Sequence, residues 1–134
     1  MNPEDAPPTK SWLVGQAEAI LDRVKDAQGF RSLTSTSQLR NMVQIVQTES
    51  EIPVLRNFIR YQTGRRATKP FWQLIHEDVL ATLDQIDARC RDQAIRRAAL
   101  QNFFGYLVRH YVYLNEASGA GSARPTAPAG RTRT

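Results

Sequence analysis

The chain has one cysteine, two histidines and no long apolar run, and each shortage excludes a class of protein. With Cys90 alone, neither a disulfide framework nor a cysteine-only metal site can form within the chain. No stretch reaches the roughly 18 uninterrupted apolar residues that a membrane-spanning helix needs. Residues 1–10 carry three prolines and two acids, where a signal peptide would have basic residues and then an apolar run. These absences predict a cytoplasmic protein with no membrane partner.

Catalytic motifs are also missing. The stretch HEDVL begins like the zinc motif H-E-x-x-H, but Leu80 stands where the second histidine would be. No histidine base is evident for Cys90, which we interpret as a structural thiol, although its neighbours Arg89 and Arg91 would lower its pKa. The acids of residues 77–92 follow no metal-loop spacing. We therefore expect a protein that is not an enzyme, with no catalytic residue, no metal site and no cofactor.

What is present indicates one folded domain. The 134 residues, 41% of them apolar, are enough to build a single core but not two. We expect a flexible lead at 1–9, a helical domain at 10–116 and a disordered basic tail at 117–134. The tail consists of small residues, prolines and three arginines, and contains no large apolar residue that would repay ordering.

Apolar residues recur with helical periodicity throughout the body, and nothing indicates a pair of strands. The first helix is expected to end at Gly29, and the second to follow the Ser-Thr-Ser stretch at 35–37. The third begins at Pro53, the fourth near Pro70, and the fifth covers about 92–115. The sequence thus predicts an all-α fold, a compact bundle of about five helices.

Each expected helix has a face that we assign to the core. In chain order these faces are Leu13, Ala17, Ile20, Leu21 and Val24; Leu39, Met42, Val43 and Val46; Val54, Leu55, Phe58, Ile59, Tyr61 and Gln62; Trp72, Ile75, Val79, Leu83 and Ile86; and Leu100, Phe104, Leu107, Tyr111 and Leu114. The four tyrosines are interpreted as core or rim residues in preference to platforms for base stacking.

Charge is distributed in blocks along the chain. Residues 31–76 carry seven basic and two acidic side chains, whereas residues 77–92 carry two basic and five acidic ones. Fifteen of the eighteen basic residues are arginine, whose planar guanidinium suits phosphate. Such alternating blocks indicate either nucleic-acid binding or contacts between copies of the chain. On the second interpretation, Asp84 and Asp87 belong to an acidic surface that faces a neighbouring subunit.

A group of basic side chains forms the candidate binding surface. It comprises Arg40, Arg56, Arg60, Arg65, Arg66 and Lys69, with Arg96 and Arg97 added from the fifth helix. Arg56 and Arg60 stand one turn apart on their helix, opposite its apolar face. Gly64 is expected to take the left-handed conformation after the helix, so that the next basic residues emerge in a loop. Each cation could instead be an ordinary solvated side chain.

Two segments resemble a known family. LTSTSQLRNMVQIV (33–46) is similar to the "S-Q-[IL]-R, apolar helix" segment of the small subunit of the type III-A CRISPR effector, the Csm complex. FIRYQTGR (58–65) is similar to the "Y-Q-x-G-R" segment of the same family, and the aromatic helix ending in FFGYLVRHYVYL resembles its last helix. The family's final segment often reads E-A-[IV]-V-A-Y-H, whereas this chain has YLVRHY.

The resemblance implies an all-helical, non-catalytic subunit that stacks in several copies along RNA in antiviral defence. Its implied partners are guide RNA, target single-stranded RNA, the other subunits of the complex and further copies of itself. Arg40 and Arg65 match the family's basic motif positions. Two alternatives stay open, namely a helical adaptor that binds an acidic protein and a helix-turn-helix DNA binder.

Overall fold

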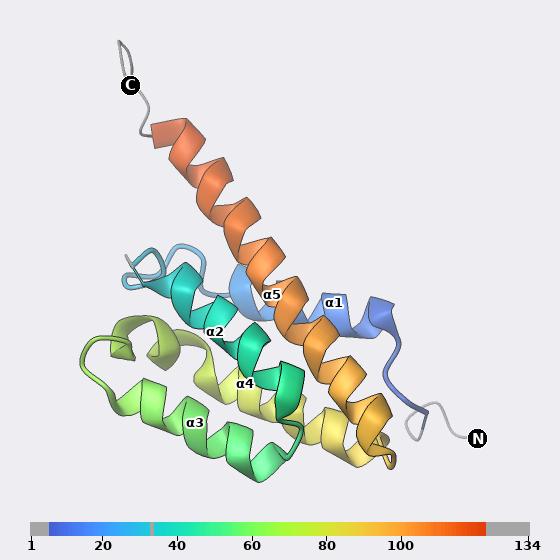
Figure 1. Ribbon diagram of the computed structural model, residues 1–134. Helices are drawn as coiled ribbons and strands as arrows, with labels where there is room; N and C mark the ends of the chain where they lie inside the picture. Colours follow the sequence, from blue (N-terminus) through green and yellow to red (C-terminus); the bar gives the residue numbers. More distant parts are fainter. Residues whose placement is uncertain (1–5, 33, 123–134) are drawn as a thin grey trace.

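The computed structural model describes residues 6–32 and 34–122, and this part of the chain is all-α, as the sequence predicted (Figure 1). Its helices are α1 (Lys10–Asp22), α2 (Ser35–Thr48), α3 (Ile52–Gly64), α4 (Lys69–Arg89) and α5 (Gln93–Ser122). Within the described ranges no residue is assigned to a strand. The prediction of a bundle of about five helices is confirmed.

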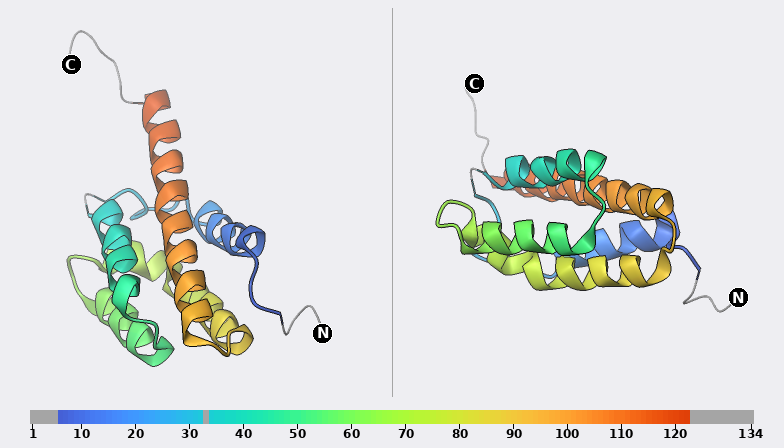
Figure 2. Two further views of the ribbon diagram at one scale, coloured as in Figure 1. Left: turned by 45° about the vertical axis from the view of Figure 1, so that its right-hand side comes forward. Right: turned by 60° about the horizontal axis from the view of Figure 1, so that its bottom comes forward.

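The helices form two layers. α5 packs against α1 and α2, α3 packs against α4, and α1 also contacts α4. Figure 2 shows α2 beside α5 in one layer and α3 beside α4 in the other, with the last turns of α5 projecting beyond the bundle. Because short loops join α2 to α3, α3 to α4 and α4 to α5, consecutive helices run antiparallel. The end of α3 and the start of α4 therefore lie at the end of the bundle where α2 begins (Figures 1 and 2).

Local sequence signals explain where the helices start. The side chain of Thr9 accepts a hydrogen bond of 3.0 Å from the backbone N–H of Trp12 and caps α1. α3 and α4 each have a proline in the first turn, where a missing N–H leaves no hydrogen bond unmade. The carboxylate of Asp92 accepts from the N–H of Ala94 at 2.6 Å, which caps α5.

The predicted inward faces of α4 and α5 are confirmed. All five of the residues assigned to the core on α4 are buried, and on α5 only Leu114 is less than fully buried. At the end of the bundle where α4 starts, Phe30, Phe71 and Tyr111 pack as an aromatic cluster with ring centroids 4.9 to 6.1 Å apart. The Tyr111 hydroxyl donates to the Phe30 carbonyl at 2.9 Å, which fixes the connection between α1 and α2 against α5.

Two predictions about α3 and its end are wrong. Val54 is 49% exposed and Tyr61 is 59% exposed, although both were assigned to the core face. Gly64 is the last helical residue and does not take the left-handed conformation. The chain leaves α3 through Arg65, which is extended at φ −78° and ψ 134°, so no left-handed residue is required there.

The predicted end of the first helix is also wrong. α1 stops at Asp22, and residues 23–30 form successive turns. Residues 25–28 are exposed and contain no large apolar side chain, so a longer helix would have no face to bury. Gly29 lies seven residues further on and has a positive φ of 97°.

α5 continues to Ser122, six residues past the predicted boundary at 116. The remainder of the predicted tail, 123–134, and residues 1–5 of the predicted lead lie outside the described residues. Within the lead, the Ala6 carbonyl accepts a hydrogen bond of 2.9 Å from Nε of Arg89. In the described part, no helix is long and apolar enough to cross a membrane.

Candidate nucleic-acid interface

Four of the predicted site residues gather where α3 turns into α4. We call Arg60, Arg65, Arg66 and Lys69 the basic corner. The loop between the helices is held by its own hydrogen bonds: the Arg65 carbonyl accepts from the N–H of Thr68 at 3.2 Å and of Lys69 at 2.7 Å. The buried Thr68 hydroxyl donates to the Gln62 carbonyl at 2.6 Å. The backbone positions of Arg65, Arg66 and Lys69 are therefore set by a structured turn, and that of Arg60 by helix α3.

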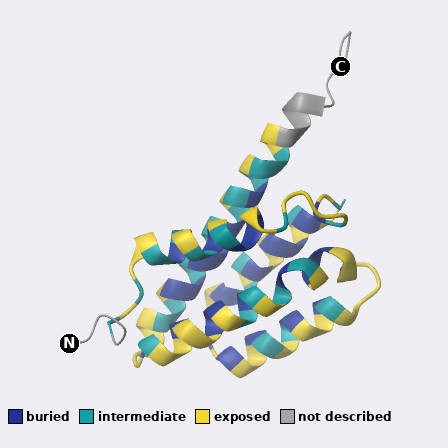
Figure 3. Ribbon diagram, turned by 180° about the vertical axis from the view of Figure 1, so that it is seen from behind, coloured by how far each residue is buried: buried dark blue, intermediate teal, exposed yellow. Residues whose placement is uncertain are grey.

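The basic corner is open to solvent. Each of its four side chains is exposed, and in Figure 3, which views the molecule from behind, the loop between α3 and α4 is exposed along most of its course. The ion pairs formed within residues 6–32 and 34–122 involve Arg23, Arg56, Arg96 and His110, and none involves the basic corner. The positive charge of the corner is thus not neutralised by carboxylates of the described chain.

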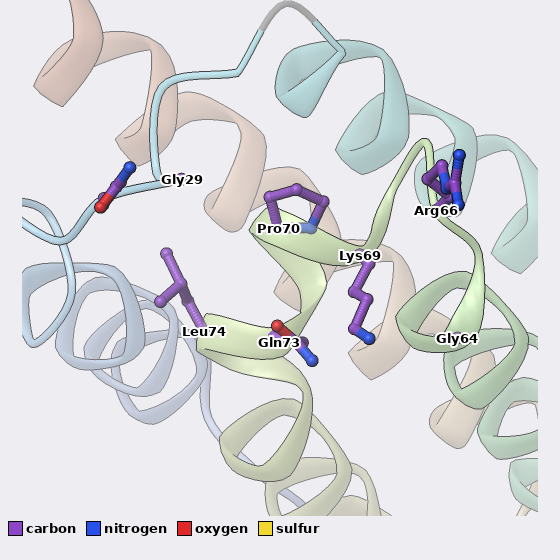
Figure 4. Close-up of a pocket in the computed structure, with 8 residues that line it drawn as sticks. Gly29, Gly64, Arg66, Lys69, Pro70, Gln73 and Leu74 are labelled. Atoms are coloured by element: carbon purple, nitrogen blue, oxygen red, sulfur yellow. The ribbon is translucent and has the colours of Figure 1, made fainter.

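A hollow of about 590 Å³ opens beside this corner (Figure 4). It lies between the α1–α2 connection, the end of α3 and the first turns of α4, and Lys69, Gln73 and Arg66 supply nitrogen donors at its wall. Its full lining is Gln28, Gly29, Gly64, Arg66, Lys69, Pro70, Gln73 and Leu74. Cationic and amide donors around an open hollow suit phosphate and ribose oxygens.

Gly29 shapes the hollow by letting two backbones approach closely. A Cβ atom at this position would lie 2.9 Å from the carbonyl oxygen of Pro70. The positive φ of Gly29 is a second reason for glycine here, because residues with a Cβ rarely adopt it. The connection from α1 is thereby held against the start of α4.

Arg40 is exposed near the start of α2 and takes part in none of the ion pairs of the described chain. Arg40 stands in the first half of α2, whose start lies at the same end of the bundle as the basic corner (Figure 1). Arg40 and Arg65 are the two positions that match the family motifs. Both are available to an anionic ligand.

Of the other three predicted site residues, Arg56 and Arg96 are held by contacts within the protein, and Arg97 is half-buried. Arg56 on α3 pairs with Asp84 on α4 at 2.5 Å. Arg96 on α5 donates to the Ser50 carbonyl at 3.0 Å and lies 3.8 Å from Asp87. Arg97 is half-buried, and its Nε is buried without a hydrogen-bond partner. The structure does not bring Arg96 and Arg97 to the basic corner, because α5 starts at the opposite end of the bundle (Figure 1).

The same contacts bear on the predicted acidic surface. Asp84 and Asp87 were assigned to a face for a neighbouring subunit, and each has an arginine of its own chain within 4.0 Å. The side chains of Asp84 and Asp87 are 59% and 51% exposed, and pairs of this kind contribute little, so reversing either charge should perturb the monomer only slightly. The acidic surface stays a prediction.

The cysteine and the two histidines lie outside the basic corner, and each has contacts within the fold. Burial raises the pKa of the Cys90 thiol above its ordinary value, and this outweighs the opposing effects of Arg96 and Arg89. His110 Nε2 lies 2.8 Å from Asp22, which joins α5 to α1. His76 Nδ1 lies 3.1 Å from the Trp72 carbonyl of its own helix. Among the described residues, no three His, Cys, Asp or Glu side chains gather as a metal site.

Sequence reasoning missed Tyr61 as a member of this surface. Tyr61 follows Arg60 on α3, within the span of the basic corner, and the guanidinium of Arg65 lies over its ring at 5.6 Å from the centroid. The signal in the sequence was its position between Arg60 and Arg65, outside the arc occupied by Leu55 and Ile59.

Comparison of the chain with protein-family models, curated proteins and solved structures found no match. The family suggested by the two motif segments accordingly stays a prediction, and function is argued from the geometry of the basic corner.

Proposed function

We propose that this chain is the non-catalytic small subunit of a type III-A CRISPR RNA-guided effector complex, acting in antiviral defence in the cytoplasm. In this proposal several copies lie along the guide RNA and its target, together with the other subunits. The observation that carries the proposal is the basic corner: four exposed cations within ten residues, none in an ion pair of the described chain. The resemblance of residues 33–46 and 58–65 to the family supports it, since both motif arginines are exposed.

The proposed role is to hold the RNA backbone. In RNA-guided complexes, base pairing reads the sequence and protein side chains contact phosphates. One copy with a few cations binds weakly and without sequence preference, and repetition along the RNA supplies avidity. If each cation of the basic corner neutralises one phosphate, log K against log salt has a slope of about −2.8.

Salt-dependent RNA binding tests the proposal. Fluorescence anisotropy with labelled single-stranded RNA would compare the native chain with the triple variant Arg60→Ala, Arg66→Ala, Lys69→Ala. Each lost phosphate contact removes about 0.7 from the slope, so the variant's slope should be shallower by about 2 and its affinity about 100-fold lower at 0.1 M salt. Circular dichroism would first establish that both chains are folded.

A charge-matched control distinguishes RNA binding at the basic corner from binding that depends only on the net charge of the chain. The triple variant Lys10→Ala, Lys25→Ala, Arg91→Ala removes the same charge from exposed positions elsewhere. It should keep the native slope. Equal losses in the two triple variants would show that binding follows net charge, and the basic corner would then be rejected as the site.

The same assay distinguishes the two alternatives. A preference for duplex DNA over single-stranded RNA would favour a helix-turn-helix DNA binder. Phe71 and Trp72 at the start of α4 are 0% exposed, which leaves Lys69, Pro70 and Gln73 as the exposed residues of that turn, a short surface for reading bases in a DNA groove. No binding to either nucleic acid would favour an adaptor whose basic surface meets an acidic protein.

A further inference from the structure

α3 carries a second apolar stripe outside its core face. Leu55 and Ile59 are buried against the rest of the protein. Val54, Phe58 and Tyr61 follow one another at spacings of four and three, which places them on one line along the helix. Val54 and Tyr61 are 49% and 59% exposed, and Phe58 is half-buried. Phe58 packs against the core, so the exposed apolar residues of this line are Val54 at one end and Tyr61 at the other.

The stripe ends among cations. Tyr61 is its last member, Arg60 precedes it, and the Arg65 guanidinium lies over its ring at 5.6 Å from the centroid. Arg66 and Lys69 follow in the exposed turn. An aromatic ring that is largely open to solvent, within ten residues of four cations without carboxylate partners, is the combination found in grooves that bind single-stranded nucleic acid.

The other tyrosines have different surroundings. Tyr111 is 1% exposed and its hydroxyl donates to the Phe30 carbonyl. Tyr106 is half-buried with Arg109 over its ring. Tyr113 is 64% exposed, but it stacks on His110, which lies 2.8 Å from Asp22 and 3.9 Å from Glu18. Tyr61 is therefore the exposed tyrosine that lies beside the basic corner, whereas Tyr113 shares its hollow with one exposed arginine, Arg109, and with the carboxylate of Glu18.

We propose that Tyr61 is a base-stacking residue: an unpaired nucleobase lies against its ring while the basic corner holds the neighbouring phosphates. This inference rests on the proposed RNA-binding function and narrows the ligand to a single strand with accessible bases, as opposed to any polyanion. Arg65 on the ring adds a cation–π contact to the same stack. Because every base has a π face, stacking on Tyr61 is tolerant of sequence, which suits a subunit that must bind any guide and target.

Ring removal gives a quantitative test. Loss of one base–aromatic stack weakens binding by about 5- to 150-fold, so Tyr61→Leu should lower RNA affinity within this range. Tyr61→Phe keeps the ring and should stay within about twofold of the native chain. Tyr113→Leu removes a tyrosine of similar exposure away from the basic corner and should leave affinity unchanged. No variant changes the charge, so all should keep the native salt slope.

Two further probes report on the base itself. An oligomer of the same length with abasic riboses should bind the native chain and Tyr61→Leu equally. A single-stranded RNA that contains one 2-aminopurine should lose fluorescence on binding to the native chain and to Tyr61→Phe, but not on binding to Tyr61→Leu. Urea unfolding would confirm that the exposed substitution leaves the fold intact.

The outcomes separate this inference from the proposed function. If native and Tyr61→Leu chains bind RNA equally, stacking is rejected and the basic corner stands. A shallower salt slope in Tyr61→Leu also rejects stacking, since the ring would then act by positioning Arg65. Normal RNA binding with altered self-association in sedimentation would reassign the stripe to a protein contact. No RNA binding by the native chain overturns both proposals.

Discussion

Replacing Arg96 with alanine should destabilise the fold, although the sequence assigned Arg96 to RNA binding. The side chain is only 16% exposed. Its Nε donates to the Ser50 carbonyl at 3.0 Å, and one terminal nitrogen donates to the Cys90 carbonyl at 3.5 Å. Arg96 thus joins α5 to the α2–α3 connection and to the end of α4.

The magnitude follows from what alanine would leave unpaired. Ser50 is 1% exposed, so its carbonyl would lose a charge-assisted donor in a place with little water, which costs about 1–3 kcal/mol. The carboxylates of Glu51 and Asp87 are 60% and 51% exposed and lie 4.0 and 3.8 Å away, and pairs of this kind contribute little. The methylene groups of the arginine side chain also lose their packing, which adds to the cost of leaving the Ser50 carbonyl without a donor. We expect a loss of about 2–3 kcal/mol in the free energy of unfolding.

Urea unfolding followed by circular dichroism measures this loss. The free energy of unfolding falls by about 1–3 kcal/mol per molar urea, so the loss should lower the urea concentration at the midpoint by about 0.7–3 M. Arg91→Ala, which removes an exposed arginine of the adjoining loop, should change the free energy of unfolding by no more than about 0.5 kcal/mol. Arg96→Met keeps most of the side-chain volume and isolates the hydrogen bonds from the packing. If Arg96→Ala is as stable as Arg91→Ala, the contacts do not stabilise the fold and Arg96 returns to the RNA-binding candidates.

Two other predictions concern stability. Gly29→Ala should cost about 2 kcal/mol or more, because φ is 97° and the new Cβ would lie 2.9 Å from the Pro70 carbonyl oxygen. Gly15→Ala, where a Cβ meets nothing within 4 Å, should instead stabilise α1 by about 0.5–1 kcal/mol, and the same sign for both would contradict the reasoning. Because burial raises the Cys90 pKa, the unfolded thiol loses its proton first as the pH rises. The free energy of unfolding should therefore decline above a pH of about 8.5, and Cys90→Ala should show a smaller decline between pH 8 and 9.5 in urea titrations.

The inward faces of α4 and α5 could be predicted because each of these helices packs against three others. The arc of buried residues is then wide enough to follow from periodicity alone. α3 packs chiefly against α4, so its buried arc is narrower. Val54 and Tyr61 fall outside that arc while remaining apolar, and periodicity assigned them to the core. An apolar residue on the flank of a helix with one main neighbour is better interpreted as a surface feature.

The ends of helices were harder to predict than their faces. Glycine indicates that a left-handed turn is allowed, but not that the chain uses one. At Gly29 the approach of Pro70, far along the chain, makes glycine necessary. At Gly64 an extended Arg65 ends the helix, and the glycine simply occupies its last position. Only the tertiary structure separates the two cases.

The candidate site was predictable where it depends on adjacent residues, and not where it depends on contacts across the fold. Arg65, Arg66 and Lys69 are neighbours in one turn, so a local pattern was sufficient. Arg56 meets Asp84, which lies 28 residues away, and Arg96 meets Ser50, which lies 46 residues away. Neither contact leaves a signal in the spacing of charges along a single helix.

The antiparallel packing of α3 on α4 explains why Arg60 stays unpaired while Arg56 does not. Moving one turn forward along α3 corresponds to moving one turn backward along α4. Arg56 lies opposite Asp84, so Arg60 faces the turn near residue 80, where α4 offers Leu80 and Ala81 in place of a carboxylate. The two acids nearer the start of α4 do not pair with the basic corner either: Asp78 pairs with Arg23 of the α1–α2 connection, and Glu77 is exposed. The register of the helix pair thus accounts for Arg56 and Arg60, whereas the partner of Asp78 comes from a third segment of the fold.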